Sequence, residues 1–481
     1  MFALFDDFLP ALPEIFLAGI LCVLMVVAVY LREERRYQFM QIGVLLGFGL
    51  TAMLLLLLSG VTLFAFNHLF INDDFAFIFK IMVLLGAFFS LIVGNDYIKR
   101  LGFNRFEYPL LAGFAVLGMM MMLSAHDLMS LYIGLELQSL SLYVLASMRR
   151  DDRLASEASL KYFVLGALAS CLLLYGASLI YGFLGATEFN DIANAIKQQG
   201  MELPKGVLIG LVFIIIAIGF KVSAVPFHMW TPDVYMGVPT SVTVFFALAP
   251  KIAAFGLFIR LLHGAFGGIV ADWQPIIMIL SALSMVLGGF AGIWQRNIKR
   301  LLAYSSIGHI GFALMGFAAG DMAGVNAVAV YLMIYLVTTL GSFACVLAMM
   351  RKGAPCEHIE DLSGFGKSHP FYALCLMLFM FSMAGIPPLA GFFAKWYVFV
   401  AAIDAGLIWL AVIGALSSVV SAYYYIRIIK VMYFEEAETE LDGHIPLAIK
   451  WVVSLCAIFV VLFVAYPDMV SIPAHIASNA L

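Results

Sequence analysis

The chain alternates between long apolar segments and short polar connections along nearly its whole length. A helix needs about 20 apolar residues to cross the roughly 30 Å hydrocarbon core of a bilayer. Fourteen segments reach about that length, and each predicts a membrane-spanning helix. Their approximate bounds are 9–31, 40–65, 75–94, 106–125, 128–148, 158–184, 206–235, 239–262, 273–294, 300–319, 324–350, 371–400, 405–430 and 447–471. The pattern therefore predicts an all-α integral membrane protein.

Two of these segments are too long and too interrupted to be plain helices. The segment at 206–235 contains Pro226. The segment at 371–400 contains Pro387 and Pro388 near its middle. Proline lacks a backbone N–H and clashes with the preceding turn, so we expect both helices to be discontinuous. Such breaks are tolerated at membrane depth where protein or water satisfies the freed backbone groups.

The two broken segments are the seventh and the twelfth, five spans apart. A repeat of five helices has odd parity, so its second copy inserts upside down. We therefore expect one repeat at about 106–262 and an inverted copy at about 273–430. Three spans at about 9–94 precede them, and a last span at about 447–471 follows. Residues 1–481 would then form a single polytopic membrane domain.

Composition and charge placement agree with this organisation. With 64% hydrophobic and 12% charged residues, the chain is not an ordinary soluble domain. Eighteen of the 26 lysines and arginines fall in the loops after odd-numbered spans, whereas only Lys197 and Lys205 fall in the opposite loops. By the positive-inside rule, both termini would lie on the outer side, which is the periplasmic side of a bacterial inner membrane.

Six basic residues lie inside the predicted spans, and three of them have an ordinary explanation. Lys80 and Arg260 lie near the outer ends, where we expect the side chains to snorkel to the interface. Lys161 lies four residues after Glu157, so a local ion pair at the inner interface explains it as well as a functional role does.

The other three, Lys221, Lys251 and Lys395, lie deeper, and Glu136 lies inside a fourth apolar segment. A charge at the bilayer centre costs about 2.5–3.5 kcal/mol on insertion scales, so such residues indicate function. A desolvated lysine also gives up its proton more readily than an exposed one. We interpret these four groups as sites that load and release protons.

Glu136 belongs to a polar stripe on its predicted helix. Tyr132, Glu136, Ser139 and Tyr143 are spaced so that they share one helical face. A carboxylate there can meet a cation from a neighbouring helix, and Lys221, five residues before Pro226, is our candidate. The alternative is a purely structural pair, but a buried pair is costly merely as a link between helices.

Lys221, Lys251 and Lys395 would define stations of a water-linked proton path across the bilayer midplane. His228 and His309 are further titratable groups in apolar segments. A histidine is a natural relay near neutral pH, although a lone one is as often a satisfied structural residue. We leave both interpretations open for these two.

Other candidate chemistry finds little support. The six cysteines include no CxxC pair, which disfavours iron–sulfur, zinc and disulfide sites. The sequence contains no GxGxxG, Walker A or HExxH motif. We therefore expect no metal, cofactor or nucleic-acid site in this chain. We interpret Tyr423, Tyr424 and Tyr425 as packing or interface aromatics.

The run KVSAVPFHMWTPDVYMGVPTSVTVFFALAPKIA at 221–253 resembles the antiporter-like subunits of respiratory complex I. Its WTPDVY version at 230–235 is similar to the N-type subunits rather than the L or M types. Matching stretches lie at 157–170, 297–311 and 384–399. The resemblance extends from about the first span to the thirteenth and combines broken-helix prolines with the lysines themselves.

The resemblance implies roles for individual residues. Glu136 and Lys221 match the family's coupled pair, Lys251 its central lysine, Lys395 its terminal lysine and Lys161 a supporting lysine. The second half contains His309 but no acid comparable to Glu136, so the two halves would not be equivalent.

The resemblance also implies a function. The chain would be a proton-translocating subunit of NADH:quinone oxidoreductase, a translocase, packed in the bilayer between other membrane subunits that include antiporter-like neighbours. NADH, FMN, iron–sulfur clusters and quinone would bind to sister subunits. Two alternatives remain: a cation/proton antiporter subunit of a related multisubunit complex, and a structural spacer.

Overall fold

The computed structural model describes residues 8–199, 203–436, 441–443 and 445–481, and helices dominate them. The helices up to the middle of the chain are η1 (Leu9–Ala11), α2 (Leu12–Tyr30), α3 (Glu33–Leu57), α4 (Asp74–Arg100), α5 (Glu107–Leu123), α6 (Leu128–Ala146), α7 (Arg153–Leu184), α8 (Phe189–Gln199), α9 (Lys205–Val222), α10 (Trp230–Gly237) and α11 (Thr240–Gly264).

The second half of the chain is also mainly helical. Its helices are η2 (Gly267–Ile269), α12 (Val270–Ile293), α13 (Ile298–Phe317), α14 (Met322–Ala348), η3 (Ile359–Leu362), α15 (Phe365–Ser368), α16 (Pro370–Ala384), α17 (Ala390–Asp404), α18 (Ile408–Phe434), α19 (Leu447–Leu462), η4 (Phe463–Ala465) and α20 (Asp468–Asn479). Two short antiparallel hairpins accompany them: β1 (Leu63–Ala65) with β2 (Phe70–Asn72), and β3 (Met350–Arg351) with β4 (Ala354–Pro355).

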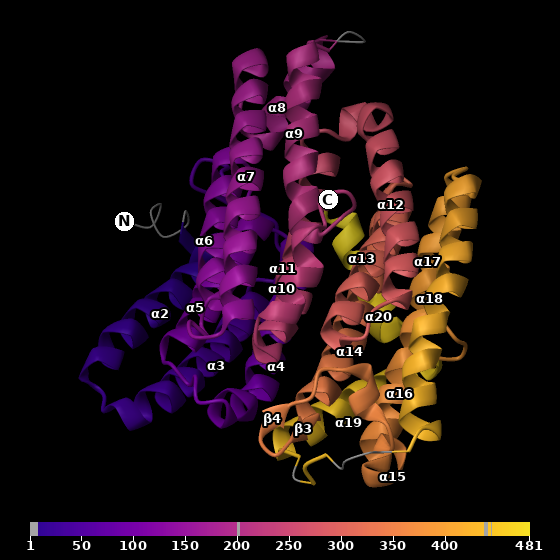
Figure 1. The fold of residues 1–481 in the computed structure, drawn as a ribbon. Coiled ribbons are helices and arrows are strands. Elements are labelled where there is room, and N and C mark those ends of the chain that lie inside the picture. The colour runs from indigo at the N-terminus through magenta and orange to yellow at the C-terminus, as the bar shows by residue number, and fades with distance from the viewer. Residues whose placement is uncertain (1–7, 200–202, 437–440, 444) are drawn as a thin grey trace.

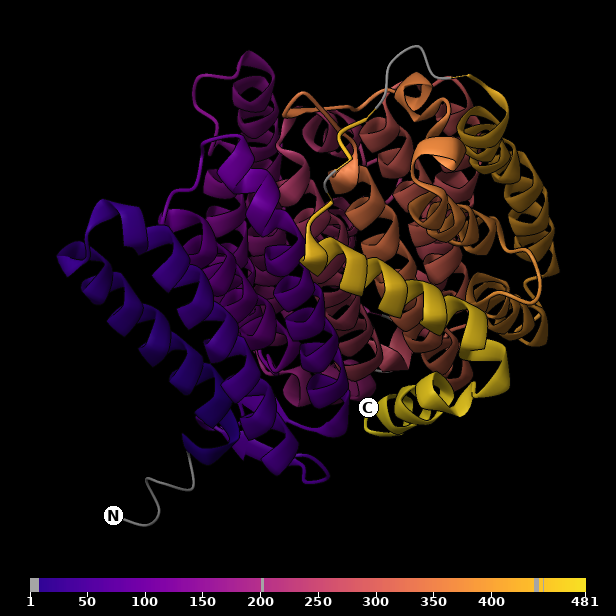
Figure 2. The same ribbon diagram turned by 90° about the horizontal axis from the view of Figure 1, so that it is seen from below.

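The long helices stand side by side, with α2 and α3 at one edge of the molecule and α18 at the other (Figure 1). Seen from below, α19 crosses the other helices obliquely, and it packs on α14, α16 and α4 (Figure 2). The most apolar stretch of α11 is completely buried and that of α14 nearly so. These two helices therefore form the centre of the bundle.

Helices occur in all fourteen predicted segments, and the class of a multi-pass helical membrane protein is confirmed. Among the described residues, eleven helices are long and apolar enough to cross a membrane. The other three predicted spans correspond to α5, to α13, and to the divided pair α16 and α17. The count of fourteen crossings and the inverted repeat stay predictions.

Several predicted segments have different bounds in the structure: the one at 75–94 is α4 and extends to Arg100, and the one at 158–184 is α7 and begins at Arg153. Two others also differ in the kind of structure that they form. The segment predicted at 40–65 is α3, which already begins at Glu33, because acidic residues in a first turn favour the helix dipole. Its predicted end is not helical, since Leu63–Ala65 pairs with β2 instead. The last segment, predicted at 447–471, ends as an α-helix at Leu462, and a new helix begins after Pro467.

Both predicted helix breaks are confirmed, between α9 and α10 and between α16 and α17. Each first half ends at a residue in the left-handed conformation, Ser223 with φ 68° and Gly385 with φ 88°. In both, the following N–H donates to a carbonyl five residues earlier, at 2.8 and 3.0 Å. This is the Schellman type of helix end. The two breaks thus share one local geometry.

Side chains satisfy backbone groups that the breaks set free. The Trp230 indole N–H donates to the carbonyl of Phe220 at 3.0 Å. In the second break, the N–H of Gly391 donates to the Ser382 hydroxyl at 3.0 Å. The broken backbone is therefore stable inside the protein, as non-helical segments at membrane depth require.

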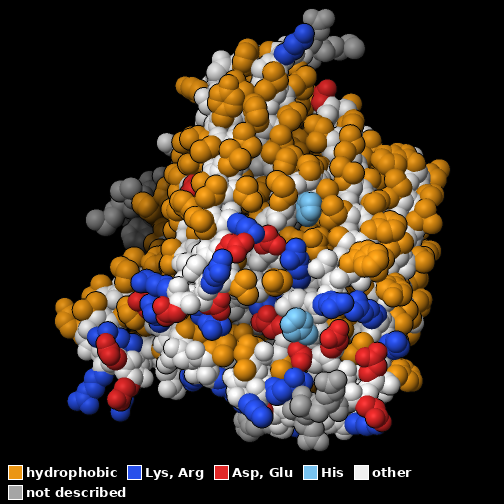
Figure 3. Space-filling model, viewed as in Figure 1, with side chains coloured by type: hydrophobic (Ala, Val, Ile, Leu, Met, Phe, Trp, Pro, Cys, Tyr) orange, Lys and Arg blue, Asp and Glu red, His pale blue; other side chains and the backbone are white. Residues whose placement is uncertain are grey.

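Charged side chains gather at one end of the molecule. On the face shown in Figure 3, they lie around the end that holds β3, β4 and α15, while hydrophobic side chains cover the rest. That end contains the basic loops that the positive-inside rule assigns to the inner side. We refer to it as the inner end.

Candidate functional site

The first buried lysine, Lys221, contacts the helix face that carries Glu136. Its Nζ donates to the Ser139 hydroxyl of α6 at 2.8 Å and lies 5.9 Å from the Tyr143 ring centre. The Glu136 carboxylate acts on Lys221 electrostatically, without a direct ion pair between them. Glu136 Oε1 is buried and has no hydrogen-bond partner among the described residues. Glu136 and Lys221 are thus close enough to interact electrostatically, and Ser139 makes the direct contact with Lys221.

The helix break determines where this ammonium group lies. Lys221 occupies the last turn of α9, whose carbonyl end carries partial negative charge. The helix ends at Ser223, and the Ala224 N–H and the Trp230 indole donate to the last carbonyls, those of Gly219 and Phe220. Lys221 therefore combines burial, 7% exposed, with a favourable dipole and a nearby carboxylate.

The second lysine, Lys251, lies on α11 at the centre of the bundle and is 1% exposed. Its Nζ donates to the Ser306 hydroxyl of α13 at 2.5 Å. The same Nζ lies 5.2 Å from the ring centre of Tyr235. Neither of these two groups is a carboxylate, so a charged Lys251 depends on a hydroxyl and an aromatic face.

His309 occupies a hydrogen-bonded position between the second and third lysines. Its Nδ1 is 2.6 Å from the Tyr331 hydroxyl, and its Nε2 is 3.1 Å from the Tyr425 hydroxyl. The charges of both Lys251 and Lys395 act on the imidazole. His309 thus lies near two of the buried lysines with both ring nitrogens hydrogen-bonded, which suits a relay and a satisfied structural histidine alike.

Small cavities border this histidine. One is lined by His309, Tyr331 and Ser382 among others. Another is lined by His309, Lys395 and Tyr425, together with further residues of α12, α13 and α18. His309 and Lys395 thus line the second cavity together, with apolar side chains such as Phe312 and Met383 between the polar groups.

The third lysine, Lys395, lies on α17 and is 6% exposed. Its Nζ donates to the carbonyl of Ala384 at 2.9 Å and to the Ser418 hydroxyl at 2.7 Å. It also lies 4.9 Å from the Phe312 ring centre. Ala384 is the last residue of α16, so this ammonium group lies at the carbonyl end of a half-helix.

Lys221 and Lys395 lie beside their breaks in different ways. Lys221 precedes its break and Lys395 follows its break, so they do not occupy the same position along the chain. The Lys395 ammonium group bonds to the carbonyl end of the first half-helix, whereas the Lys221 ammonium group bonds to Ser139 of another helix. Helix C-termini favour cations, so the second break supports the charge of Lys395 directly.

Lys161 lies apart from these buried groups. Its side chain is 43% exposed and pairs with Glu157 at 2.9 Å, as the sequence predicted. It also pairs with Asp233 of α10 at 2.8 Å, and Arg300 of α13 lies 3.4 Å from the same carboxylate. Asp233 thus ties α10 to α7 and α13, a role that sequence reasoning missed although Asp233 lies in the WTPDVY segment.

His228 lies in the segment between α9 and α10 and is half-buried. Its Nδ1 is buried and has no hydrogen-bond partner among the described residues. It belongs to the non-α-helical segment 223–229 and lies seven residues after Lys221. The structure therefore brings together Glu136 with Lys221, and His309 with Lys251 and Lys395, but places His228 with neither group.

Several hydroxyl partners were not predicted. Ser306, Ser418 and Tyr331 were not singled out, and Tyr425 was interpreted as a packing aromatic. Tyr425 in fact contacts His309 and shares a 2.5 Å hydrogen bond with Ser305. Serine and tyrosine are common in membrane helices, so the sequence offers no signal that separates these from the others.

The snorkelling predicted for Lys80 and Arg260 is wrong. Lys80 is completely buried and pairs with Glu14 of α2 at 2.5 Å. Arg260 is 3% exposed and makes a bidentate pair with Asp73 at 2.6 and 2.9 Å. Each base has an acid from a distant helix end, so it need not reach the membrane surface.

A helical membrane bundle with two broken helices and buried lysines beside them defines an ion-translocating class of membrane protein. A profile match specifies the class further. Residues 125–421 match the family described as NADH:quinone oxidoreductase/Mrp antiporter, transmembrane. The chain belongs to this family, and the resemblance noted in the sequence is confirmed.

Individual relatives narrow the assignment. NADH-quinone oxidoreductase subunit N of Rhodospirillum rubrum is 52% identical over 98% of this chain and 97% of its own length. The protein of the same name from Parvibaculum lavamentivorans is 49% identical over 99% and 98%. The predicted similarity to N-type subunits is therefore confirmed.

Solved structures agree. A chain of respiratory complex I from Thermus thermophilus with bound aureothin is 33% identical, with a TM-score of 0.81, over 95% of this chain and 98% of that chain. A chain of the Mrp complex from Dietzia sp. DQ12-45-1b is 20% identical, with a TM-score of 0.85, over 99% and 97%. The second likeness concerns the fold alone.

Proposed function

We propose that this chain is a proton-translocating membrane subunit of an NADH-quinone oxidoreductase. The observation that carries the proposal is the set of three buried ammonium groups, each hydrogen-bonded to a serine hydroxyl from another helix. Relatives named as subunit N, of which one is 52% identical, support the choice of complex. Protons would move through Glu136, Lys221, Lys251 and Lys395.

The hydroxyl partners suit a lysine that alternates between two protonation states. A serine hydroxyl accepts a hydrogen bond from the charged amine and can rotate to donate one to the neutral amine. A buried charge without an anionic partner is costly, so the neutral form is within reach. Lys251 and Lys395, which have hydroxyls and carbonyls as hydrogen-bond acceptors, meet this requirement.

His309 would carry the proton between these two lysines. Imidazole can take up a proton at one nitrogen and release another from the second nitrogen. Tyrosine hydroxyls occupy both ring nitrogens of His309, and their rotation would pass the proton on. Lys161 and His228 have supporting roles in this proposal, Lys161 by holding α10 through Asp233.

Glu136 would act as the switch for Lys221. A carboxylate that moves toward Lys221 stabilises its charged form, and one that moves away favours proton release. The unpartnered Oε1 of Glu136 leaves the carboxylate free of competing hydrogen bonds on that oxygen. A small displacement of α6 relative to α9 therefore changes how firmly Lys221 holds its proton.

Pumping requires energy from outside the chain, since moving one charge against 100 mV costs about 2.3 kcal/mol. In this proposal it comes from quinone reduction on sister subunits, which would bind NADH, FMN, iron–sulfur clusters and quinone. Other membrane subunits of complex I, including antiporter-like neighbours, would pack against the lateral faces. Exposed apolar side chains on α3, such as Leu46, Met53 and Leu57, suit a neighbour or the bilayer.

We place the chain in a bacterial inner membrane with fourteen crossings and both termini outside. The repeat at about 106–262 and its inverted copy at about 273–430 belong to the same proposal. The Schellman-type ends of both broken helices support the repeat. The concentration of basic residues in alternate loops supports the orientation.

The test is replacement of Lys251 by methionine in the assembled complex. Methionine retains apolar length but carries no proton, so we expect quinone-linked NADH oxidation and proton pumping to fall by about tenfold or more. Lys367→Met is the matched control because that side chain is 80% exposed at the inner end. Full pumping by Lys251→Met in normally assembled complex would refute the proposed relay.

The second candidate is a cation/proton antiporter subunit of a related multisubunit complex, favoured by the fold it shares with the Mrp chain. The same buried lysines would serve that function. Sodium-driven proton exchange in vesicles that contain the assembled complex, measured without NADH, separates the two. Exchange that disappears with Lys251→Met would support the antiporter, and its absence supports the redox-driven pump.

A further inference from the structure

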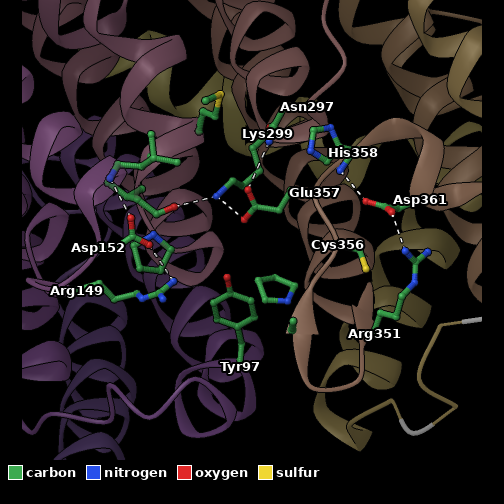
Figure 4. A pocket seen from close by; sticks show the side chains of 17 residues that line it. Tyr97, Arg149, Asp152, Asn297, Lys299, Arg351, Cys356, Glu357, His358 and Asp361 are labelled. Carbon is green, nitrogen blue, oxygen red and sulfur yellow. Dashed lines mark hydrogen bonds and ion pairs between the residues drawn. The ribbon is translucent and has the colours of Figure 1, made fainter.

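A polar pocket opens at the inner end, away from the relay residues. Figure 4 shows its lining, to which Tyr97, Arg149, Asp152, Lys299, Glu357 and Asp361 contribute. These residues come from α4, from the connection between α6 and α7, from α13, and from the segment between α14 and α15. The pocket therefore lies where the two halves of the chain meet. We call it the inner vestibule.

One ion pair forms part of the vestibule wall. Lys299 Nζ lies 2.6 Å from Glu357 Oε1, and the Lys299 side chain is 2% exposed while that of Glu357 is 23% exposed. Lys299 also donates to the carbonyl of Val238 at 2.9 Å. The carboxylate is thus the partner that water reaches, and the ammonium group lies behind it.

Glu357 is also bonded to the first turn of α11, the helix that carries Lys251. The Thr240 hydroxyl donates to Glu357 Oε1 at 3.3 Å, and the Tyr97 hydroxyl donates to Thr240 Oγ1 at 3.3 Å. Lys251 follows Thr240 by eleven residues. At 1.5 Å per residue, about 16 Å of helix separates them.

The first turn of α11 carries a second bonded hydroxyl group, on Thr243, on the side of the vestibule. The Thr243 hydroxyl donates to the carbonyl of Tyr235 at 3.1 Å. The ring of Tyr235 then lies 5.2 Å from Lys251 Nζ. On the opposite side, α13 begins at the vestibule and carries Ser306, the partner of Lys251. Both helices that hold Lys251 in place thus start at the vestibule.

The ion pair is not needed to attach the Glu357 segment to the protein. The N–H of Ile298 donates to the carbonyl of Glu357, and the N–H of Ile359 donates to the carbonyl of Arg296, both at 2.8 Å. These two backbone bonds already fasten the segment to the start of α13. The carboxylate is therefore available for a role other than attachment.

We propose that the inner vestibule supplies protons to Lys251 and that Glu357 is the carboxylate that takes them up from the inner aqueous phase. The inference rests on the proposed function, because it adds an uptake site to that relay. The other charged groups of the vestibule are engaged with each other. Arg149 pairs with Asp152 at 3.3 Å and Arg351 with Asp361 at 3.1 Å, whereas Glu357 pairs with Lys299.

His358 and Cys356 also line the vestibule, and Asn297 donates to Glu357 Oε2 at 3.4 Å. In the uptake step, hydronium in the vestibule transfers a proton to the Glu357 carboxylate and leaves water. The neutral acid then transfers that proton to the Thr240 hydroxyl oxygen as the hydroxyl releases its own proton to a water molecule on the side of Lys251. Water molecules along the roughly 16 Å of helix pass one proton on to the neutral Lys251 amine, where an N–H bond forms, and Glu357 returns to the carboxylate.

Protonation also changes the neighbouring ion pair. A neutral Glu357 holds Lys299 less tightly, while the Val238 carbonyl keeps accepting from the ammonium group. Lys299 is therefore a positioning residue, because it acts on the carboxylate rather than on the moving proton. Loss of the proton toward Lys251 restores the pair and readies the carboxylate for the next uptake.

The test uses Glu357→Gln in the assembled complex, in vesicles with the inner end facing outward. We expect proton pumping to fall on the order of tenfold, less than the about 10²- to 10⁴-fold effect of a positioned proton-transfer group, because water still reaches Thr240. The deficit should grow as the pH at the inner face is raised and protons become scarce. Glu357→Asp retains a carboxylate and should pump better than Glu357→Gln. Glu360→Gln, in the same segment but exposed, should match the unchanged complex.

Two results would overturn the inference. One is normal pumping by Glu357→Gln at every pH while Lys251→Met loses pumping, which would refute the uptake site alone. Normal pumping by both variants would refute the proposed function as well. The other is reduced assembly with unchanged pumping per complex and no pH trend, which would make the ion pair structural.

Should Glu357→Gln not assemble, a thiol reagent gives an independent answer. A charged, water-soluble thiol reagent applied at the inner face should slow pumping by complex that carries His358→Cys, since His358 is exposed and lines the vestibule, and should leave the unchanged complex unaffected. Labelling of the introduced thiol without any change in pumping would contradict a role for the vestibule in proton uptake.

Discussion

At the scale of the residue, Gly385 carries two constraints at once. Its φ of 88° lies in the left-handed region, where side chains other than glycine's are strained. A Cβ placed there would lie 3.0 Å from Lys395 Cδ and 3.3 Å from Lys395 Nζ. The same position therefore ends α16 and leaves room for the third buried lysine to reach the carbonyl of Ala384.

Gly385→Ala separates these two effects when it is compared with Gly406→Ala. Gly406 has a φ of 77°, but nothing lies within 4 Å of its added Cβ. Both variants should lose about 1 kcal/mol of stability from backbone strain. Only Gly385→Ala should also slow proton pumping, because it displaces Lys395. Unfolding temperature and pumping rate are the measurements, and equal pumping by the two variants would contradict the expectation.

The buried bases illustrate how far residue-level reasoning extends. Lys80 and Arg260 were visible as costly charges, but their partners Glu14 and Asp73 lie far away along the chain. An opposite charge on a neighbouring helix changes the expected position of a lysine from the membrane surface to the interior. Periodicity within one helix carries no information about that neighbour.

At the scale of the element, backbone hydrogen bonds join three connections into a cluster around His126. The N–H of Ile71 donates to the carbonyl of Ser124 at 2.8 Å, and the N–H of His126 donates to the carbonyl of Leu69 at 3.1 Å. The N–H of Phe189 donates to the backbone carbonyl of His126 at 3.0 Å. The hairpin β1–β2, the α5–α6 connection and the start of α8 are thereby joined. His126 itself is 8% exposed at the centre of the cluster.

This cluster should weaken in acid. Burial lowers the pKa of His126 from 6.5 to about 4, and Arg260 and His68 add to the shift while Asp73 and Asp127 oppose it. The folded state therefore disfavours the protonated histidine. Its contribution to stability is complete above pH 6.5 and declines as the pH falls toward 4.

The measurement is the unfolding temperature of the detergent-solubilised protein across that pH range. The reference is the His126→Gln variant. It retains Glu188, whose carboxylate lies 3.8 Å from the His126 ring, so the titration of that carboxylate is present in the variant and in the unchanged protein. The unchanged protein should lose more thermal stability between pH 6.5 and 4 than His126→Gln does. Parallel losses would contradict the proposed role of His126.

The broken helices show what an element's own sequence can predict. Pro226 and the pair at 387–388 predicted the two breaks, and both breaks occur. The helices actually end at left-handed residues a few positions earlier, Ser223 and Gly385. Proline disfavours helical conformation in the residue before it, so the chain leaves the helix before the proline is reached.

At the scale of the whole molecule, the orientation in the membrane depends on the number of crossings. Fourteen crossings place both termini outside, whereas thirteen or fifteen would separate them. An epitope tag after Leu481 should therefore be accessible from the outer face of intact cells. A tag inserted at Gly353, in the exposed turn of the inner hairpin, should be accessible only in inverted vesicles. Protection of the C-terminal tag in intact cells would contradict the count.

Much of the large-scale arrangement follows from the sequence because the bilayer is a simple solvent. Segment length, proline position and loop charge respond to its thickness, its lack of hydrogen-bonding groups and its surface potential. These properties predicted the helices, both breaks and the deep lysines. The N-type resemblance then assigned roles to Glu136, Lys221, Lys251 and Lys395.

The tertiary structure alone decided which groups those lysines contact. Lys251 and its partner Ser306 are 55 residues apart, and His309 and Tyr425 are 116 residues apart. Such partners are ordinary serines and tyrosines whose proximity depends on how whole helices pack. The inner vestibule, with Glu357 against Lys299, likewise exists only once the two halves have met. The sequence determined which apolar segments carry costly charges, because the residues around a charge along its own segment can be read there. Packing decided their partners, because hydrogen bonds between helices depend on all segments together.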